Sequence, residues 1–104
     1  MALPVLSPPL LVLASLADGP KHGYAMIEDI KRMTGVTLGA GTLYGAIPRL
    51  LQSGWIKRRR ESDAPRDRQT YELTAAGRDV LHSEIDRMKL LARVASLRLT
   101  RTEA

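Results

Sequence analysis

The sequence predicts a mostly α-helical fold with a β-hairpin past its middle and one long helix at its end. Apolar residues recur at spacings of three and four in three stretches, a pattern typical of helices with one buried face. A further stretch, around residue 62, has a polar turn with proline between two short runs suited to strands. Because 104 residues fit one domain with one core, we expect a compact unit over residues 1–73, continued by a helix over residues 74–104.

The composition narrows the possible functions. The chain has no cysteine, which excludes a disulfide framework and a thiolate metal site and is compatible with the cytoplasm, where we expect the protein to act. The formal net charge is +5, from 16 Lys and Arg against 11 Asp and Glu. This excess is moderate, so the positions of the basic residues indicate a partner better than their number does.

The first helix is expected from Pro8 to about Ala17. Ser7 is a good N-cap, and proline is tolerated in a first turn because those N–H groups lack helical partners. The run 10–17 is apolar on nearly all sides, so the helix must be covered from more than one direction. No basic residue precedes the run, and it is much shorter than the roughly 20 residues of a membrane span. A buried helix is therefore expected, not a signal peptide or an anchor.

A second helix is expected from Gly23 to Thr34, closed by Gly35. Its inward stripe is predicted to consist of four residues, Tyr24, Ile27, Ile30 and Met33. A short glycine-bearing turn leads from it to the next helix. Two helices joined in this way form a helix-turn-helix candidate.

The third helix, over about residues 42–53, has two dissimilar faces. One face is apolar and is made of Leu43, Ile47, Leu50 and Leu51, and Gly54 follows where a left-handed helix stop belongs. The other face carries small or polar residues and a single charge, namely Thr42, Tyr44, Gly45, Ala46, Arg49, Gln52 and Ser53. A solvated helix of this length usually carries several Lys and Glu, so this face is expected to approach another surface.

A two-stranded hairpin, or wing, is predicted next. Residues 55–61 and 68–73 form its strands, and residues 62–67 form its turn, which contains Pro65. Tyr71 and Leu73 are expected to point inward. Arg58 and Arg60 share one face of their strand, while Lys57 and Arg59 share the other, so all four cannot point at the same partner.

The last helix is expected to begin after the cap residue Thr74 and to continue to about Leu99. Its apolar seam follows heptad-like spacing over Leu81, Ile85, Met88, Ala92, Ala95 and Leu99, widened by Leu90, Leu91, Val94 and Leu97. A helix of this length is roughly 40 Å long, more than so small a domain covers by itself. We therefore expect a homodimer, with dimerisation residues Leu81, Ile85, Met88, Leu91, Ala92, Ala95 and Leu99.

Three segments resemble the PadR family of bacterial transcription regulators. They are His22-Gly23-Tyr24, then Gly41-Thr42-Leu43-Tyr44 continued by Gly54-Trp55-Ile56, and the run from Arg68 to Arg78. The resemblance spans about residues 8–82 and is specific because all three segments follow in order. It implies a winged helix-turn-helix dimer that binds double-stranded operator DNA, usually as a repressor. The length resembles the compact branch with a single C-terminal dimerisation helix.

The chain departs from the family pattern at two positions of the third helix. Gly45 stands where many members have proline, and Pro48 lies inside the helix. Proline removes one backbone hydrogen bond and is expected to kink the helix unless it falls in the first turn. The seating of this helix on a partner therefore depends on how Pro48 is accommodated.

The predicted DNA contacts lie on the third helix and the wing: Thr42, Tyr44, Gly45, Arg49, Arg58, Arg60, Arg66 and Arg68. Hydroxyls at a helix start can donate to phosphate, and Arg49 could reach a guanine edge or a phosphate. Arg66 and Arg68 flank the hairpin tip and suit the DNA backbone or minor groove. The alternative for Tyr44 is packing within its own domain.

Other functions are less well supported by the sequence. His22 and His82 are the only histidines and lie far apart in the chain, and neither has a companion for metal binding or nucleophilic catalysis, so we expect no metal, no cofactor and no enzyme. His22 is expected to cap its helix or to lie near DNA. A winged helix used for protein docking, without DNA binding, remains the alternative. The operator, the sign of regulation and the effector, if there is one, are open. The resemblance implies that some members hold flat aromatic effectors on aromatic residues of the C-terminal helix, but this helix has no such residue, so an aliphatic pocket is the alternative.

Overall fold

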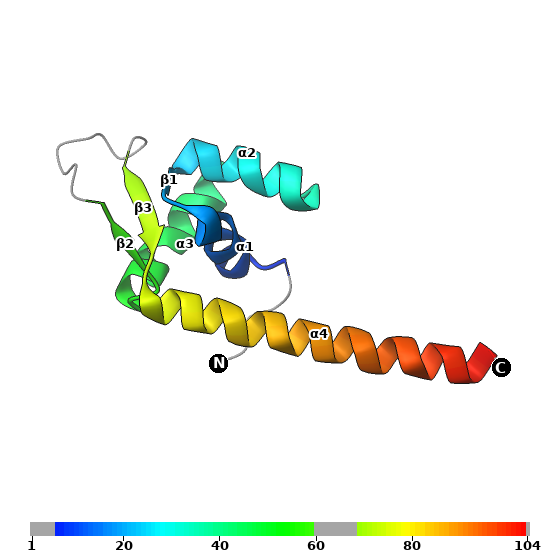
Figure 1. Cartoon of the computed structure of the whole chain (residues 1–104). Helices are drawn as coiled ribbons and strands as arrows, with labels where there is room; N and C mark the ends of the chain where they lie inside the picture. The colour runs from blue at the N-terminus through cyan, green and yellow to red at the C-terminus, as the bar shows by residue number, and fades with distance from the viewer. Residues whose placement is uncertain (1–5, 60–68, 104) are drawn as a thin grey trace.

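The computed structural model describes residues 6–59 and 69–103, with residues 102 and 103 by their backbone only. A domain of short elements packs on the first part of one long helix, which then projects away from it (Figure 1). The elements in chain order are α1 (Pro8–Ser15), a 3-10 turn (Leu16–Asp18), β1 (Lys21–His22), α2 (Gly23–Thr34), α3 (Ala40–Gln52), β2 (Ile56–Arg58), β3 (Thr70–Leu73) and α4 (Ala75–Glu103). The molecule measures 61 × 26 × 21 Å. The mostly helical fold with a small sheet is therefore confirmed.

Helix α1 is the buried centre of the domain. Ser7 adopts the extended conformation of an N-cap, the two prolines occupy the first turn, and the carbonyl oxygen of Ser7 accepts from the Leu11 N–H at 2.9 Å. Residues 10–13 are all buried, because α2, α3 and α4 all contact this helix. None of the helices among the described residues is both long and apolar enough to cross a membrane.

Helix α2 begins and ends as predicted, but its inward face is different. Met26 and Ile30 are fully buried, whereas Tyr24 is 54% exposed and Met33 is 45% exposed. The predicted stripe used a spacing of three throughout, which drifts around a helix of 3.6 residues per turn, so its two ends rotate out of the core. The buried residues Gly23, Met26 and Ile30 instead follow spacings of three and four.

The sheet has three antiparallel strands in the order β1-β3-β2, and not the two strands predicted. Strand β1 pairs Lys21 with Tyr71 and His22 with Thr70. Strand β2 pairs Ile56 with Leu73, Lys57 with Glu72 and Arg58 with Tyr71. Two residues of polar character give no alternation to recognise, which is why β1 is invisible in the sequence. The predicted turn over residues 62–67 lies outside the described part of the chain.

Helix α4 starts at a joint that ties it to the end of α3. The hydroxyl oxygen of Thr74 accepts from the Gly77 N–H at 3.0 Å and donates to the Gly54 carbonyl at 2.5 Å. A Cβ added at Gly77 would lie 1.9 Å from the carbonyl oxygen of Trp55, so only glycine permits this approach. The first turns of α4 therefore belong to the domain core, and the assignment of residues 1–73 to DNA binding and of residues 74–104 to dimerisation, within one compact unit, stays a prediction.

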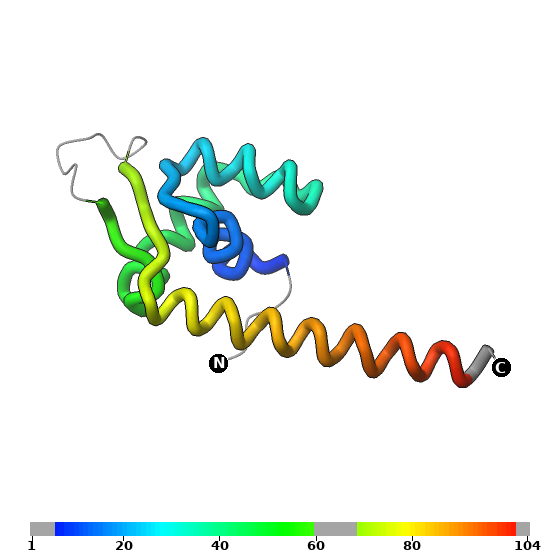
Figure 2. Tube along the Cα trace, viewed as in Figure 1, coloured from blue at the N-terminus to red at the C-terminus, as the bar shows by residue number. Residues whose placement is uncertain are grey.

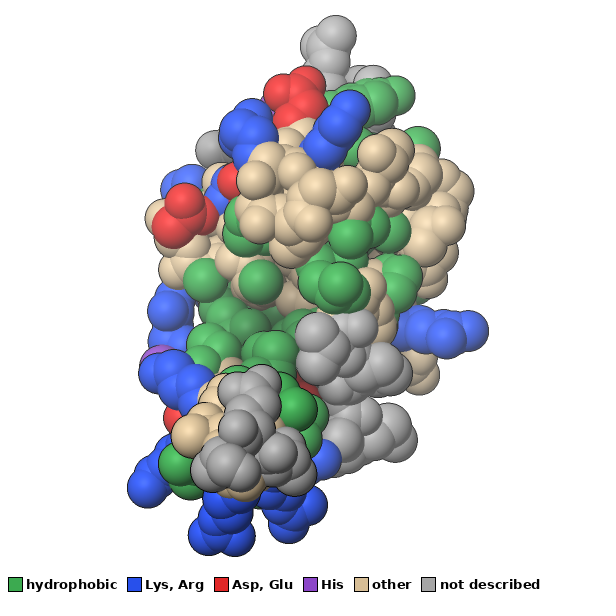
Figure 3. Space-filling model, turned by 90° about the vertical axis from the view of Figure 1, so that its right-hand side faces the viewer, with side chains coloured by type: hydrophobic (Ala, Val, Ile, Leu, Met, Phe, Trp, Pro, Cys, Tyr) green, Lys and Arg blue, Asp and Glu red, His purple; other side chains and the backbone are tan. Residues whose placement is uncertain are grey.

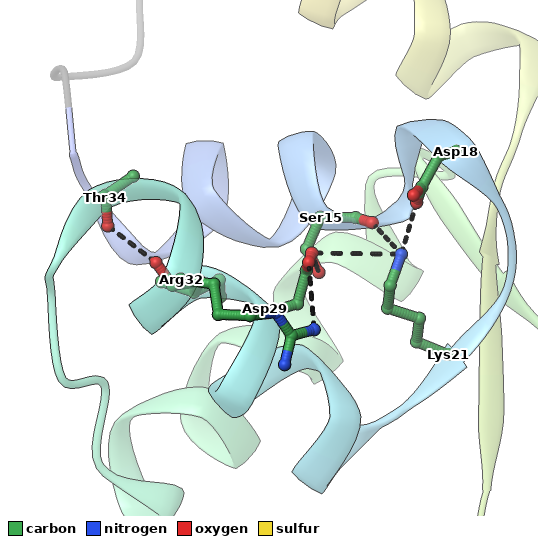
Figure 4. A network of polar contacts seen from close by, with 7 residues as sticks. Ser15, Asp18, Lys21, Asp29, Arg32 and Thr34 are labelled. Carbon is green, nitrogen blue, oxygen red and sulfur yellow. Dashed lines mark hydrogen bonds and ion pairs between the residues drawn. The ribbon is translucent and has the colours of Figure 1, made fainter.

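A polar network at the edge of the core links α1, β1 and α2 (Figure 4). The buried hydroxyl of Ser15 at the end of α1 donates to Asp29 Oδ2 at 2.7 Å, and Arg32 lies 3.5 Å from the other carboxylate oxygen. Lys21 Nζ donates to the Ser15 carbonyl and to the Asp18 carboxylate, and this bond lowers the pKa of Asp18 below its ordinary value. The network fixes α1, β1 and α2 relative to one another.

The close approach at Gly77 gives a test of the joint. Gly77→Ala should lower the free energy of unfolding by about 1–3 kcal/mol or more, because the new methyl group meets backbone that cannot move aside. Gly45→Ala is the matched control: its Cβ meets no described atom within 4 Å, and replacing a helical glycine should add up to about 1 kcal/mol. Urea unfolding measures both. Equal stability of the two variants would contradict the geometry at Gly77.

The network predicts coupling between Ser15 and Asp29. Asp29→Ala should destabilise the fold by about 1–3 kcal/mol, because it leaves a buried hydroxyl without its acceptor. Ser15→Ala added to that variant should recover part of the loss, since the unsatisfied group is then removed as well. Thermal or urea unfolding of the four combinations measures the coupling, and strictly additive effects would show that the two side chains do not interact.

Candidate nucleic-acid interface

Helix α3 presents one face that the rest of the domain leaves uncovered. Its buried residues are Leu43, Ala46, Ile47 and Leu50. Opposite them, at spacings of four, three and four, lie Gly41, Gly45, Pro48 and Gln52, all exposed. We call these four residues the open stripe. The stripe carries no charge, and only Gln52 extends a polar side chain from it.

A second line of exposed residues borders the open stripe. Thr42 and Arg49 are seven residues apart, so their side chains leave α3 on the same side. Thr42 lies in the first turn of α3, where backbone N–H groups favour anions, and the N-cap residue Gly39 has no side chain with which to bind them. The structure thus leaves Thr42, Gly45 and Arg49 accessible, as a role in binding requires. Ala46, predicted on this face, is instead buried against the core.

The side chain of Tyr44 reaches into the domain with its hydroxyl end. Its hydroxyl oxygen is buried, and a Cβ added at Gly23 would lie only 2.2 Å from that oxygen. This arrangement is the alternative given above, in which the ring packs within its own domain. The hydroxyl is therefore not placed to donate to a phosphate, and the glycine of the His22-Gly23-Tyr24 segment makes room for it.

Pro48 does not interrupt α3, which continues from Ala40 to Gln52. The proline lies well past the first turn, so it removes the hydrogen bond that its N–H would make to the Tyr44 carbonyl. The helix is held beyond it by a closed C-terminal turn: the Gly54 N–H donates to Leu51 at 3.1 Å and the Trp55 N–H donates to Leu50 at 3.1 Å. Gly54 has φ of 76°, as predicted for the stop.

The register of the sheet assigns the wing residues to faces. Arg58 opposes the buried Tyr71, so its side chain leaves the strand on the face toward α3. Lys57 opposes Glu72 on the other face and lies 3.6 Å from its carboxylate. Of the two strand faces distinguished above, that of Arg58 lies toward α3. Arg60, Arg66 and Arg68 fall outside the described residues.

A hollow of about 440 Å³ opens between the exposed side of α3 and the strands of the wing. It is lined by Ile47, Pro48, Arg58, Gln69 and Tyr71, which combine an apolar floor with polar groups. The open stripe of α3 and the guanidinium of Arg58 thus border one depression. We call it the α3–wing hollow.

Helix α4 has two apolar faces beyond the domain. Ala92, Ala95 and Leu99 continue the seam, while Leu90, Val94 and Leu97 lie on the opposite side and do not widen it as expected. Leu97 is 56% exposed and Leu99 is 63% exposed. Leu81, predicted at a dimer contact, is 8% exposed and belongs to the core of its own domain. Residues 87–101 carry five basic side chains and no acidic one.

A groove of about 280 Å³ with an almost wholly apolar lining follows α1 and α4. Its walls include Leu10, Leu11 and Ala14 of α1 and Leu81, Ile85 and Met88 of α4. Figure 3, viewed from the C-terminal side of α4, shows hydrophobic side chains gathered between this helix and the domain, with basic side chains around the helix end. We call this depression the α1–α4 groove.

One of the two histidines has a structural role at the start of a helix. His22 caps α2, since its Nδ1 accepts from the Ala25 N–H at 3.3 Å, which confirms the capping role expected for it. In the described ranges, no group of three or more His, Cys, Asp or Glu side chains is arranged to hold a metal ion.

The chain is similar to known proteins in both sequence and fold. The profile of the transcriptional regulator PadR-like family matches residues 12–83. An uncharacterized 37.1 kDa protein in transposon TN4556 of Streptomyces fradiae is 41% identical over 83 residues, or 80% of this chain. The chain spans 23% of that protein's length.

Solved structures share the fold. A transcriptional regulator from Clostridium thermocellum superposes with a TM-score of 0.72 at 24% identity, over 86% of each chain. A PadR family transcription regulator from hypervirulent Clostridium difficile gives 0.72 at 23% identity, over 88% of this chain and 97% of the other. Bacillus subtilis PadR in complex with operator DNA gives 0.66 at 22% identity, over 80% of this chain and 48% of the other.

Proposed function

This chain belongs to the PadR-like family of transcriptional regulators, and we propose that it acts as a homodimeric repressor that binds a pseudo-palindromic DNA operator. The observation that carries the proposal is the uncovered face of α3. The uncharged open stripe, bordered by Thr42 and Arg49, leaves room for a duplex to approach the helix. Bacillus subtilis PadR, which shares this fold, has been solved in complex with operator DNA, and this supports DNA as the partner of this chain.

In this proposal α3 enters the major groove and the wing lies beside it. Among the described residues, Arg49 borders the open stripe on one side and Arg58 borders it on the other. Each guanidinium can neutralise a phosphate. Arg60, Arg66 and Arg68 remain proposed contacts of the same kind, from the strand end and tip of the wing. Gly45 contributes by its size, since the helix backbone can come close to the base edges there.

The dimer is proposed from the two apolar faces of α4. A helix that is apolar on opposite sides must be covered by two surfaces, and its own domain covers only the first turns. A second copy offers both: its own α4 for the seam of Ala92, Ala95 and Leu99, and its α1–α4 groove for Leu90 and Leu97. Ile85 and Met88 line that groove, and Leu91 borders the seam, so these three residues remain proposed dimer contacts.

Pairing of two copies would set the distance between two α3 helices. Helices that enter successive turns of one face of a duplex are about 34 Å apart, which makes the operator a pseudo-palindrome. An effector would act by changing the angle between the two halves, and we place this regulation in the cytoplasm. A chain that docks on another protein would instead give no DNA complex at physiological salt, so the binding experiments below separate that alternative from the proposal.

Salt dependence tests the charge contacts. Selection of bound sequences from random duplex DNA supplies the operator, and its affinity is then measured across salt concentrations. If six phosphates are neutralised per dimer, log K should fall against log salt with a slope of about −5. Arg58→Gln should make the slope shallower by about 2 per dimer, one for each copy.

Lys57→Gln is the control for this measurement. It removes the same charge from the same strand, but on the face that is turned toward Glu72, so the slope should stay near that of the unchanged protein. Equal effects of the two substitutions would contradict the assignment of strand faces. A complex insensitive to salt would contradict the proposed role of the wing.

Substitutions on the far part of α4 test the dimer without disturbing the core. Leu97→Asp and Leu99→Asp should each abolish association and operator binding together, because each places a charge in a proposed apolar contact. Sedimentation measures the mass, and gel shift measures binding. Lys89→Asp introduces the same side chain on a charged side of the helix and should remain dimeric. Tight operator binding by a monomeric variant would refute the mechanism.

A further inference from the structure

Building on the proposed DNA binding, we propose that Pro48 determines sequence preference by packing its ring against the C5-methyl group of a thymine in the major groove. Pro48 lies at the centre of the open stripe and is exposed in the isolated chain. Its ring offers carbon atoms only, and its nitrogen has no hydrogen to donate. It therefore has nothing to offer the hydrogen-bonding edges of the bases, and its match among major-groove groups is the thymine methyl.

The two glycines of the open stripe make this contact reachable. Gly45 precedes Pro48 by three residues and Gly41 by seven, so both lie on its side of the helix. A Cβ added at either meets no described atom within 4 Å, so packing in the domain does not require glycine. A glycine inside a helix costs about 0.5–1 kcal/mol relative to alanine. The space beyond these positions is open to a duplex, whose bases could then come close to the backbone of α3.

Arg58 supports the contact from across the α3–wing hollow. Pro48 and Arg58 both line this depression, one from the helix and one from the strand. A DNA strand whose thymine methyl faces Pro48 has its own sugar-phosphate backbone alongside, and a backbone running through the hollow would bring phosphate to the guanidinium. The two side chains then divide their roles: Arg58 binds any sequence, while Pro48 favours thymine.

Deoxyuridine provides the test, because it differs from thymidine only by that methyl group. The duplex recovered by selection is synthesised with deoxyuridine at one thymine position at a time, in both half-sites. One position should weaken binding about fourfold per half-site, the effect of withdrawing one buried methyl-sized group. Pro48→Ala restores a helical N–H and should keep the fold. In this variant, the free energy of binding lost when uracil replaces thymine at that position should be less than half of the loss in the unchanged protein.

Two further variants keep the test independent of stability. Gln52→Ala removes the next side chain of the same stripe and should leave the thymine-to-uracil ratio at that position unchanged. Gly45→Ala should stabilise the fold yet lower the ratio of operator affinity to random-duplex affinity, since its methyl group occupies the space proposed for DNA.

The outcomes distinguish this inference from the function on which it rests. An operator that is bound equally well with uracil at every thymine position would overturn the thymine contact and leave DNA binding intact. Discrimination that persists in full in Pro48→Ala would overturn the role of Pro48. Failure of the selection to recover any duplex would instead count against the proposed function itself.

Discussion

The structure depends on the joint where α3, the sheet and α4 meet. Thr74 links the carbonyl of Gly54, just past the end of α3, to the first turn of α4, and its own N–H donates to the Trp55 carbonyl at 3.1 Å. Gly77 has no Cβ, so α4 can pass directly over the Trp55 carbonyl. Because these contacts tie the backbone after α3 to the first turn of α4, the direction of the long helix is fixed relative to α3. Figure 2 shows the chain leaving the sheet directly into α4.

The joint between α3 and α4 holds the exposed face of α3 and the far part of α4 in a fixed relative orientation. The polar network of Ser15, Lys21 and Asp29 holds α1 and α2 in place on one side, and the pairing of β1 with β3 closes the sheet on the other. The face of α3 is thus held by contacts that do not include its exposed residues. The exposed residues of α3 that are proposed to meet DNA are therefore free to vary without loss of the fold.

The sequence predicts the structure best where the apolar periodicity of a helix or a capping residue at its end determines the local conformation. The burial of α1, the stops at Gly35 and Gly54 and the start of α4 after Thr74 were all predictable from local chemistry. The two-residue strand β1 was not, because its pairing depends on residues nearly fifty positions away. The buried position of the Tyr44 hydroxyl depends on Gly23, and the role of Leu81 depends on where α1 lies, so neither follows from spacing within one helix.

The run of basic residues on the far part of α4 has a consequence for the response to ionic strength. Between residues 87 and 101 each copy carries five positive charges and no negative one, so two copies brought together repel each other there. Added salt screens this repulsion and favours self-association, while the same salt weakens attraction to phosphate. In the proposed dimer, assembly and DNA affinity would therefore respond to salt in opposite directions, and occupancy of an operator would be greatest at an intermediate ionic strength.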